Sequence, residues 1–265
     1  MTRSHHQLAN KVLVVVGGST GLGLSAARAF AREGARLVIV GRNRTSLAKA
    51  QRELGRLSIA ISGDASDPKT ANRAVAQAIK TFGAFHGLYH VAGGSGRKAG
   101  DGPLDQITDD GWEYTLGINL NSMFYSNRAA TQMLLKQKIA GTILNIGSVL
   151  GSSPSPHFFT THAYAAAKSA VIGFTRACAS YYAPHNIRFN VLAPALVATP
   201  MSQRAQEDPA ILEFMKTKQP LDGGRIGQPE DLDAAAVFFM SDASKFVTGQ
   251  VLAVDGGWSV SEGQY

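Results

Sequence analysis

Short apolar runs rich in β-branched residues alternate along the chain with segments of helical spacing, and this alternation constrains the possible folds more than any other feature. After the first run, apolar residues recur at Leu22, Ala26 and Phe30, and Gly34 stands where the helix would end. Strands that alternate with helices indicate βαβ units, in which a parallel sheet carries helices on both faces. The predicted strands are 12–16, 37–40, 57–61, 87–91, 142–146, 187–192 and 251–254. The sequence therefore predicts an α/β fold with a doubly wound parallel sheet.

The length and composition indicate one large domain. The chain has 265 residues, of which 45% are hydrophobic and 17% charged, enough to bury an extensive core. We expect a polar N-terminal tail over residues 1–10 and a single domain over residues 11–265. The first residues lack the apolar core of a signal peptide, and no run approaches the roughly 20 apolar residues of a membrane span. We therefore predict a cytoplasmic protein that does not bind membranes.

The charge balance favours anionic ligands of small size. The net charge is +7, but the basic residues are scattered, with no run of four and no interleaved aromatic residues, so we predict no nucleic-acid partner. A phosphorylated cofactor or an acyl-thioester substrate would fit this charge equally well. The single cysteine has no partner, and the seven histidines lack ligand spacing, so we predict no metal site.

The segment "VLVVVGGSTGLGLSAARAF" at residues 12–30 fits two chemistries. The letters from Gly17 to Gly21 match G-x-S-x-G, the turn that exposes a nucleophilic serine, here Ser19, in hydrolases. With Gly23 added, the glycines instead fit a dinucleotide loop, in which the backbone approaches a pyrophosphate at a helix N-terminus. In this second interpretation we expect Ser19 and Thr20 to cap the helix and to contact phosphate.

The end of the second predicted strand favours the dinucleotide interpretation. Gly41 and Arg42 stand 18 and 19 residues after Gly23, where such sites place the residue that reads the adenosine ribose. An acid there would repel a 2′-phosphate, whereas a guanidinium binds one through a planar charged fork. The hydrolase interpretation leaves Gly23 and Arg42 unexplained. We therefore expect NADP(H) as the preferred cofactor, with NAD(H) as the alternative.

A second group of residues suggests proton transfer. Ser148 follows a predicted strand, and Tyr164 and Lys168 stand four residues apart at the start of an apolar helix, so they share one helix face. A nearby ammonium stabilises a phenolate, and we expect it to lower the tyrosine pKa from about 10 toward neutrality. Such a tyrosine can exchange a proton with an alcohol or a carbonyl oxygen.

Together these motifs resemble the short-chain dehydrogenase/reductase family over nearly the whole chain. The resemblance rests on the glycine loop, on Asp64 in "SGDASD", on Asn119 in "LGINLNSMF", on the serine, tyrosine and lysine above, and on the segment "IRFNVLAPALVATPM". It implies a Rossmann-type fold. The cofactor site expected from the loop and the resemblance comprises Gly17, Ser19, Thr20, Gly21, Leu22, Gly23, Arg42, Asp64, Ala65, Ala92, Gly93, Asn119, Tyr164, Lys168, Pro194, Val197 and Thr199.

The resemblance also implies roles for the catalytic residues. Tyr164 would be the general acid and base, and Ser148 would polarise the carbonyl oxygen. Lys168 would bind the nicotinamide ribose and pass protons to a water held by the backbone of Asn119. The expected function is an NADP(H)-dependent oxidoreductase that interconverts a carbonyl and a secondary alcohol, similar to 3-oxoacyl-thioester reductases. The alternatives are an NAD-dependent alcohol or sugar dehydrogenase and a dinucleotide-binding sensor without catalysis.

Several positions depart from the family pattern. His90 and Val91 replace two asparagines, and we expect Val91 to be a buried strand end and His90 to bond a backbone group. Ala195 replaces a glycine. The interval of 16 residues between Ser148 and Tyr164 is long, which predicts a modified substrate wall. The candidates for substrate contact there are His157, Phe158, Phe159 and His162, and the alternative is that they belong to a packed loop or a subunit interface.

Two further segments bear on the substrate and on assembly. We expect residues 201–222 to form a flap over the substrate. The predicted helices 111–136 and 163–182 are more apolar than a helix facing solvent should be, which suggests that they pack against another subunit. The resemblance implies a homotetramer, with a homodimer as the alternative.

Overall fold

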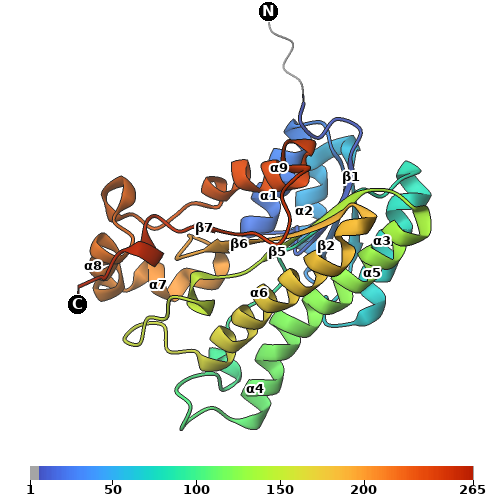
Figure 1. Cartoon of the computed structure of the whole chain (residues 1–265). Coiled ribbons are helices and arrows are strands. Elements are labelled where there is room, and N and C mark those ends of the chain that lie inside the picture. The colour runs from blue at the N-terminus through green and yellow to red at the C-terminus, as the bar shows by residue number, and fades with distance from the viewer. Residues whose placement is uncertain (1–5, 265) are drawn as a thin grey trace, which may run out of the picture.

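A computed structural model of the chain describes residues 6–264 and shows one twisted parallel sheet with helices on both faces, as Figure 1 illustrates. Within the described residues the strand order is β3-β2-β1-β4-β5-β6-β7, so the chain winds outward from β1 to one edge and then returns beside it. This is the Rossmann-type doubly wound order that the alternating runs predict. The strands are β1 (Val12–Val16), β2 (Arg36–Gly41), β3 (Ser58–Ser62), β4 (Gly87–His90), β5 (Gly141–Ile146), β6 (Ile187–Pro194) and β7 (Val251–Val254).

The central strand β1 shows how the sheet holds its two layers. Its side chains alternate between the faces, with Leu13 and Val15 packed on one side and Val12, Val14 and Val16 on the other. The first face is covered by α1 (Gly21–Arg32), α2 (Arg44–Leu54) and α9 (Asp233–Met240), and the second by α3 (Pro68–Phe82), α5 (Ser122–Gln137) and α6 (His162–Tyr182). Because both faces are buried, the strand is continuously apolar rather than alternating.

The helices follow the expected segments, with one interruption. The described helices are α1 (Gly21–Arg32), α2 (Arg44–Leu54), α3 (Pro68–Phe82), α4 (Asp109–Leu116), α5 (Ser122–Gln137), α6 (His162–Tyr182), α7 (Gln203–Glu207), α8 (Pro209–Lys218) and α9 (Asp233–Met240). The single helix predicted over residues 111–136 is instead α4 and α5, joined by the π-helical turn Gly117–Asn121. This turn inserts an extra residue and re-aims the side chains beside it.

A third hydrophobic cluster lies off the sheet, where the chain after β5 and β6 meets α7 and α8. It contains Val149, Leu196, Phe214 and Trp258, with Phe158 packed against it. The segment expected as a flap is therefore helical and packs on the loop 151–161, and Figure 1 shows α7 and α8 beyond the ends of β6 and β7.

The expected N-terminal tail falls partly outside the described residues, which begin at His6. In the described part, Leu8 is fully buried in the core beside α1, and its amide donates to the carbonyl of Glu33 at 3.0 Å. Core packing thus begins before Lys11, where we expect the domain to start. Across residues 6–264 no helix combines the length and apolar character that crossing a bilayer requires.

Candidate active site

The glycine loop between β1 and α1 is built so that two backbone segments approach closely. Gly17 has a positive φ of +93°, and a Cβ there would lie 2.6 Å from the amide nitrogen of Ala92, which follows β4. A Cβ on Gly23 would lie only 2.1 Å from the carbonyl oxygen of Gly17. Side chains at these positions would push the loop off the sheet, so the glycines are required by contact as well as by conformation.

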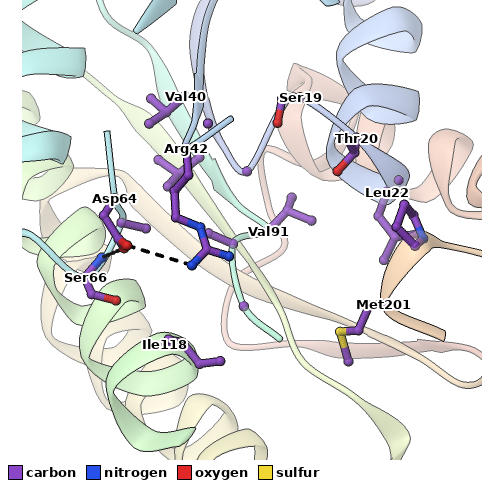
Figure 2. A pocket seen from close by; sticks show the side chains of 18 of the residues that line it. Ser19, Thr20, Leu22, Val40, Arg42, Asp64, Ser66, Val91, Ile118 and Met201 are labelled. Carbon is purple, nitrogen blue, oxygen red and sulfur yellow. Dashed lines mark hydrogen bonds and ion pairs between the residues drawn. The ribbon is translucent and has the colours of Figure 1, made fainter. Parts of the chain in front are cut away.

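A cavity of about 230 Å³ opens beside this loop, at the carboxyl ends of the central strands. Ligands of doubly wound sheets bind at such a switch point, where the strand order reverses. Figure 2 shows the cavity from close by. It is lined by Val16, Gly17, Ser19, Thr20, Gly21, Leu22, Val40, Gly41, Arg42, Gly63, Asp64, Ala65, Ser66, Val91, Ala92, Gly93, Ile118, Thr199, Pro200 and Met201.

The structure brings most of the expected cofactor residues to this cavity. Those that line it are Gly17, Ser19, Thr20, Gly21, Leu22, Arg42, Asp64, Ala65, Ala92, Gly93 and Thr199. Those that do not are Gly23, Asn119, Tyr164, Lys168, Pro194 and Val197. Sequence reasoning missed Ile118, Pro200 and Met201, the strand residues Val16 and Val40, and Gly63 and Ser66, which follow β3. Val91, expected as a buried strand end, instead follows β4 and lines the cavity while half-buried.

Ser19 and Thr20 differ from expectation. Thr20 occupies the N-cap position of α1, but its side chain makes no capping hydrogen bond. Ser19 Oγ lies 2.6 Å from the place where a Cβ on Gly41 would be, so Ser19 packs against that glycine. This contact gives a steric reason for the missing acid at position 41. Within residues 6–264 Ser19 has no histidine partner, which removes the support for a nucleophilic serine.

Arg42 and Asp64 face each other across the mouth of the cavity, as Figure 2 shows. The guanidinium lies 3.8 Å from the carboxylate, and the side chains are 65% and 50% exposed. Asp64 also accepts a hydrogen bond from the amide of Ser66 at 2.8 Å. An exposed ion pair of this kind contributes about 0 to 1 kcal/mol, so little free energy holds Arg42 in this position.

The catalytic candidates meet where β5 ends and α6 begins. Tyr164 lies in the first turn of α6 and makes a side-chain hydrogen bond with Ser148, whose Oγ also accepts from the amide of Leu150 at 3.2 Å. The start of α6 is held by Asp101, whose two carboxylate oxygens accept from the amides of Ala163 and Tyr164 at 3.0 Å each. Asp101 caps this helix from 63 residues away, so no local pattern could have revealed it.

Burial dominates the protonation of the tyrosine and lysine. It raises the pKa of Tyr164 to about 12, against the opposing effect of the Ser148 hydrogen bond, and lowers the pKa of Lys168 to about 8. The Lys168 ammonium donates to the carbonyl of Ile146 at 3.0 Å and lies 5.5 Å from the centre of the Tyr164 ring. The expected lowering of the tyrosine pKa toward neutrality is therefore wrong for this structure. Tyr164 keeps its proton at neutral pH.

Asn119 lies in the π-helical turn, and its side chain forms hydrogen bonds with the segment that follows β4. Its amide nitrogen donates to the carbonyls of Gly94 and Thr115 at 2.9 Å each, and its oxygen accepts from the Gly94 amide at 3.1 Å. A Cβ on Gly93 would lie 2.7 Å from that oxygen. The side chain thus positions the segment that borders both the cavity and Lys168.

His90 is fully buried behind this segment and is bonded by side chains rather than by a backbone group alone. Its ring nitrogens lie 3.1 Å from Ser126 Oγ and 3.3 Å from Ser122 Oγ. Burial and the nearby charge of Lys168 lower the pKa of His90 to about 3. The ring is therefore neutral at physiological pH and serves as a packed polar link between β4 and α5.

The segment after β6 and the loop 151–161 border the other side of the site. Pro194 ends β6, and Val197 forms a bridge with Gly227. Phe158 packs on Phe214 of α8 with ring centres 5.2 Å apart. Phe159 packs on Trp258 at 5.5 Å, His157 packs on Phe158 at 4.5 Å, and His162 begins α6. The structure thus packs Phe158 on the segment expected as a flap and places His162 at the start of α6, and the contact of these four residues with substrate stays a prediction.

Comparison with known proteins agrees with this geometry. The family model described as Enoyl-(Acyl carrier protein) reductase matches residues 16–259. Galactitol 2-dehydrogenase (L-tagatose-forming) from Cereibacter sphaeroides is 35% identical over 97% of this chain and 98% of its own. The 3-oxoacyl-(acyl-carrier-protein) reductase FabG from Chlamydia trachomatis serovar D is 34% identical over 94% and 98%.

Among solved structures, a short-chain type dehydrogenase/reductase from Mycobacterium ulcerans superposes with a TM-score of 0.89 at 30% identity and covers 97% of this chain and 92% of its own. The sheet order, the glycine loop and the match along nearly the whole chain lead to one assignment. The chain belongs to the short-chain dehydrogenase/reductase family, whose members use nicotinamide dinucleotides, and is an oxidoreductase for alcohol or carbonyl substrates.

Proposed function

We propose that the protein is an NADP(H)-dependent oxidoreductase that interconverts a carbonyl and a secondary alcohol, with Tyr164 as the general acid and base. The observation that carries the proposal is the half-buried Tyr164, which is hydrogen-bonded to Ser148 and whose ring centre lies 5.5 Å from the Lys168 ammonium. A nicotinamide cofactor would supply the hydride when bound. The cavity beside the glycine loop fits such a group, because Gly17 and Gly21 line it at the N-terminus of α1, where the backbone can approach a pyrophosphate.

The chain's own residues perform the proton chemistry. The Ser148 hydroxyl donates to the substrate oxygen and fixes its position, and the Tyr164 hydroxyl transfers its proton to that oxygen as negative charge develops there. The Lys168 ammonium stabilises the phenolate that remains. Because the pKa of Tyr164 is raised to about 12, the phenol is protonated at neutral pH and is ready to donate, which is the state that carbonyl reduction requires.

Replacing Tyr164 by phenylalanine tests the catalytic assignment. The substitution removes the acidic proton and keeps the ring, so NADPH binding should persist. Reduction of a ketone panel should fall by about a hundredfold or more, which is the usual contribution of general acid catalysis. Stopped-assay product analysis and nicotinamide fluorescence measure the two effects separately. Full turnover by Tyr164→Phe would remove the tyrosine from the mechanism, and a wild type that binds cofactor but reduces no ketone would favour a dinucleotide sensor.

The preference for NADP(H) rests on Arg42, at the mouth of the cavity. Its weak ion pair with Asp64 leaves the guanidinium able to turn to a 2′-phosphate. Arg42→Ala should weaken NADPH binding about tenfold to a hundredfold, the value of one charge-assisted hydrogen bond, and NADH binding much less. Arg44→Ala is the matched control, because Arg44 is exposed at the start of α2 and does not line the cavity.

The competing candidate is an NAD-dependent alcohol or sugar dehydrogenase, and Asp64 is the observation in its favour. A carboxylate 3.8 Å from Arg42 would repel a second negative group at the same place. Fluorescence titration of the wild type with NADPH and NADH distinguishes the two candidates. Tighter NADH binding, or equal losses of both cofactors in Arg42→Ala, would exclude the phosphate-binding role of Arg42 and leave the enzyme class unchanged.

We also propose that the protein associates with itself as a homotetramer or homodimer. Large apolar side chains on α4, α5 and α6 are exposed, among them Tyr114, Phe124 and Tyr181, the last 72% exposed. Contiguous apolar surface on helices is typical of subunit contacts. Light scattering coupled to size exclusion would detect the assembly, and a monomer at micromolar concentration would exclude it.

A further inference from the structure

Two arginines from distant segments converge on one backbone oxygen near the catalytic helix. Arg97, in the short 3-10 turn Arg97–Ala99 after β4, donates from Nη2 to the carbonyl of Phe158 at 3.2 Å. Arg204, in α7 of the flap, donates from Nη2 to the same oxygen at 3.1 Å. Phe158 belongs to the loop 151–161, so the exit of β4, this loop and the flap all meet at one carbonyl.

The positive charge of this pair is not balanced by an acid in contact with it. Between residues 6 and 264 no carboxylate lies within 4.0 Å of either guanidinium. Asp101 is near enough to act on Arg97, but both of its oxygens already accept backbone amides of α6. Partial burial and then the charge of Arg204 lower the pKa of Arg97, against the opposing charge of Asp101. Two like charges held together in this way favour a bound anion.

The pair lies outside the cavity beside the glycine loop and is linked through Asp101 to the start of the helix that carries Tyr164. Neither Arg97 nor Arg204 lines the cavity beside the glycine loop. Arg97 lies three residues after Gly94, whose amide donates to the side chain of Asn119. The negative charge of Asp101 raises the pKa of Arg97, and the same carboxylate accepts a hydrogen bond from the amide of Tyr164. Both arginine side chains are exposed, and within the described residues each guanidinium uses a single N–H in a hydrogen bond. Further N–H donors on each are thus available.

We infer that the substrate of this enzyme carries a carboxylate, which Arg97 and Arg204 bind while the carbonyl lies at Tyr164. The inference rests on the proposed function and specifies its substrate class. A carboxylate offers two oxygens and a full negative charge to the two planar guanidinium groups, whereas the Phe158 carbonyl offers them one shared neutral oxygen. Since Arg204 comes from the flap and Arg97 from the body of the domain, a bound carboxylate also joins the flap to the site.

Matched pairs of substrates that differ only in charge test this inference. The probes are 3-oxobutanoate, 4-oxopentanoate and 5-oxohexanoate, each compared with its methyl ester in NADPH-dependent reduction. The wild type should favour the acid in kcat/KM by at least about tenfold at one chain length, the value of a charge-assisted contact. The chain length that gives the largest ratio reports the distance between the two subsites.

Single variants then assign the effect to the arginines. Arg97→Gln and Arg204→Gln should each lower the acid-to-ester ratio of kcat/KM about fivefold to tenfold. The control is Lys98→Gln, which removes an exposed neighbouring charge that donates no hydrogen bond within the described residues, and its ratio should change less than twofold. If Arg97→Gln fails to fold, Arg97→Lys should retain part of the ratio, because it keeps the charge but loses the fork.

The outcomes separate this inference from the proposed function. Reduction of the esters or of a neutral cyclic ketone, with no preference for any acid, would refute the carboxylate site and leave the oxidoreductase proposal standing. Equal losses for acid and ester in both arginine variants would also refute it, because they would show that the arginines only order the loop 151–161. Failure to reduce any carbonyl would contradict the proposed function itself.

Discussion

The pKa of Lys168 predicts a pH limit for carbonyl reduction. Burial lowers this pKa to about 8, whereas the pKa of Tyr164 is raised to about 12, so between pH 6 and 10 the lysine is the member of the pair that titrates. The ammonium is the form that stabilises a phenolate. For a pKa of about 8, the protonated fraction is about nine-tenths at pH 7 and about one-tenth at pH 9. We therefore expect kcat/KM for reduction to fall about tenfold between these pH values.

The assay follows NADPH oxidation with a fixed ketone in a constant-ionic-strength buffer from pH 6 to 10. Lys168→Met should be much slower and should show no limb near pH 8, because the titrating group is gone. Lys136→Met, an exposed position on α5, should keep the wild-type profile. A wild-type profile that stays flat to pH 10 would refute the reasoning, as would a limb near pH 8 that persists in Lys168→Met.

Two further variants test packing and electrostatics. Gly23→Ala should weaken NADPH binding at least about tenfold and destabilise the fold by about 1 to 3 kcal/mol, because its Cβ would lie 2.1 Å from the Gly17 carbonyl oxygen. Gly173→Ala is the control, since Gly173 is exposed in α6 with no atom within 4 Å of an added Cβ, and it should stabilise the fold by about 0.5 to 1 kcal/mol. Fluorescence titration measures cofactor binding, and urea unfolding measures stability. Asp233→Asn should raise the free energy of unfolding at pH 7.5 by about 1 to 3 kcal/mol, because burial raises the pKa of Asp233 to about 6 and one of its oxygens has no partner among the described residues. Since the pKa of Asp233 is higher in the folded state than in the unfolded state, its ionisation destabilises the wild type fully above pH 6, and this destabilisation disappears as pH falls toward 4. A variant less stable than the wild type at pH 7.5 would contradict this account.

The fold could be predicted from the sequence because strand positions are recorded in local runs. β1 occupies the predicted residues 12–16, and β6 extends past the predicted end at residue 192 because Ala193 and Pro194 still pair with β7; Pro194, which lacks an N–H, is its last residue. The π-helical turn at Gly117–Asn121 escaped prediction for a physical reason. One inserted residue shifts the phase of a helical pattern without changing its apolar character, so the spacing of apolar residues still predicts one continuous helix.

The contacts that complete the site are long-range, and local patterns do not record them. Asp101 caps α6 across 63 residues, and Arg97 and Arg204 reach Phe158 across 61 and 46. Spacing could place Tyr164 on the same helix face as a lysine, but the environment of that face depends on what covers it. Burial, not spacing, decides the charge of such groups.

The order in which Tyr164 and Lys168 titrate explains why their spacing predicted the wrong direction for the pKa of the tyrosine. A lysine lowers a tyrosine pKa only while it is charged, and Lys168 loses its proton near pH 8, well below the pH at which a phenol with a pKa of about 12 ionises. Below pH 8 the pair therefore holds two protons, one on the ammonium and one on the phenol. A site in this state can give a proton to a substrate oxygen at once, whereas alcohol oxidation must first remove the phenol proton. Reduction should accordingly be the faster direction at neutral pH, and the initial rate of oxidation should increase with pH over the range in which reduction falls.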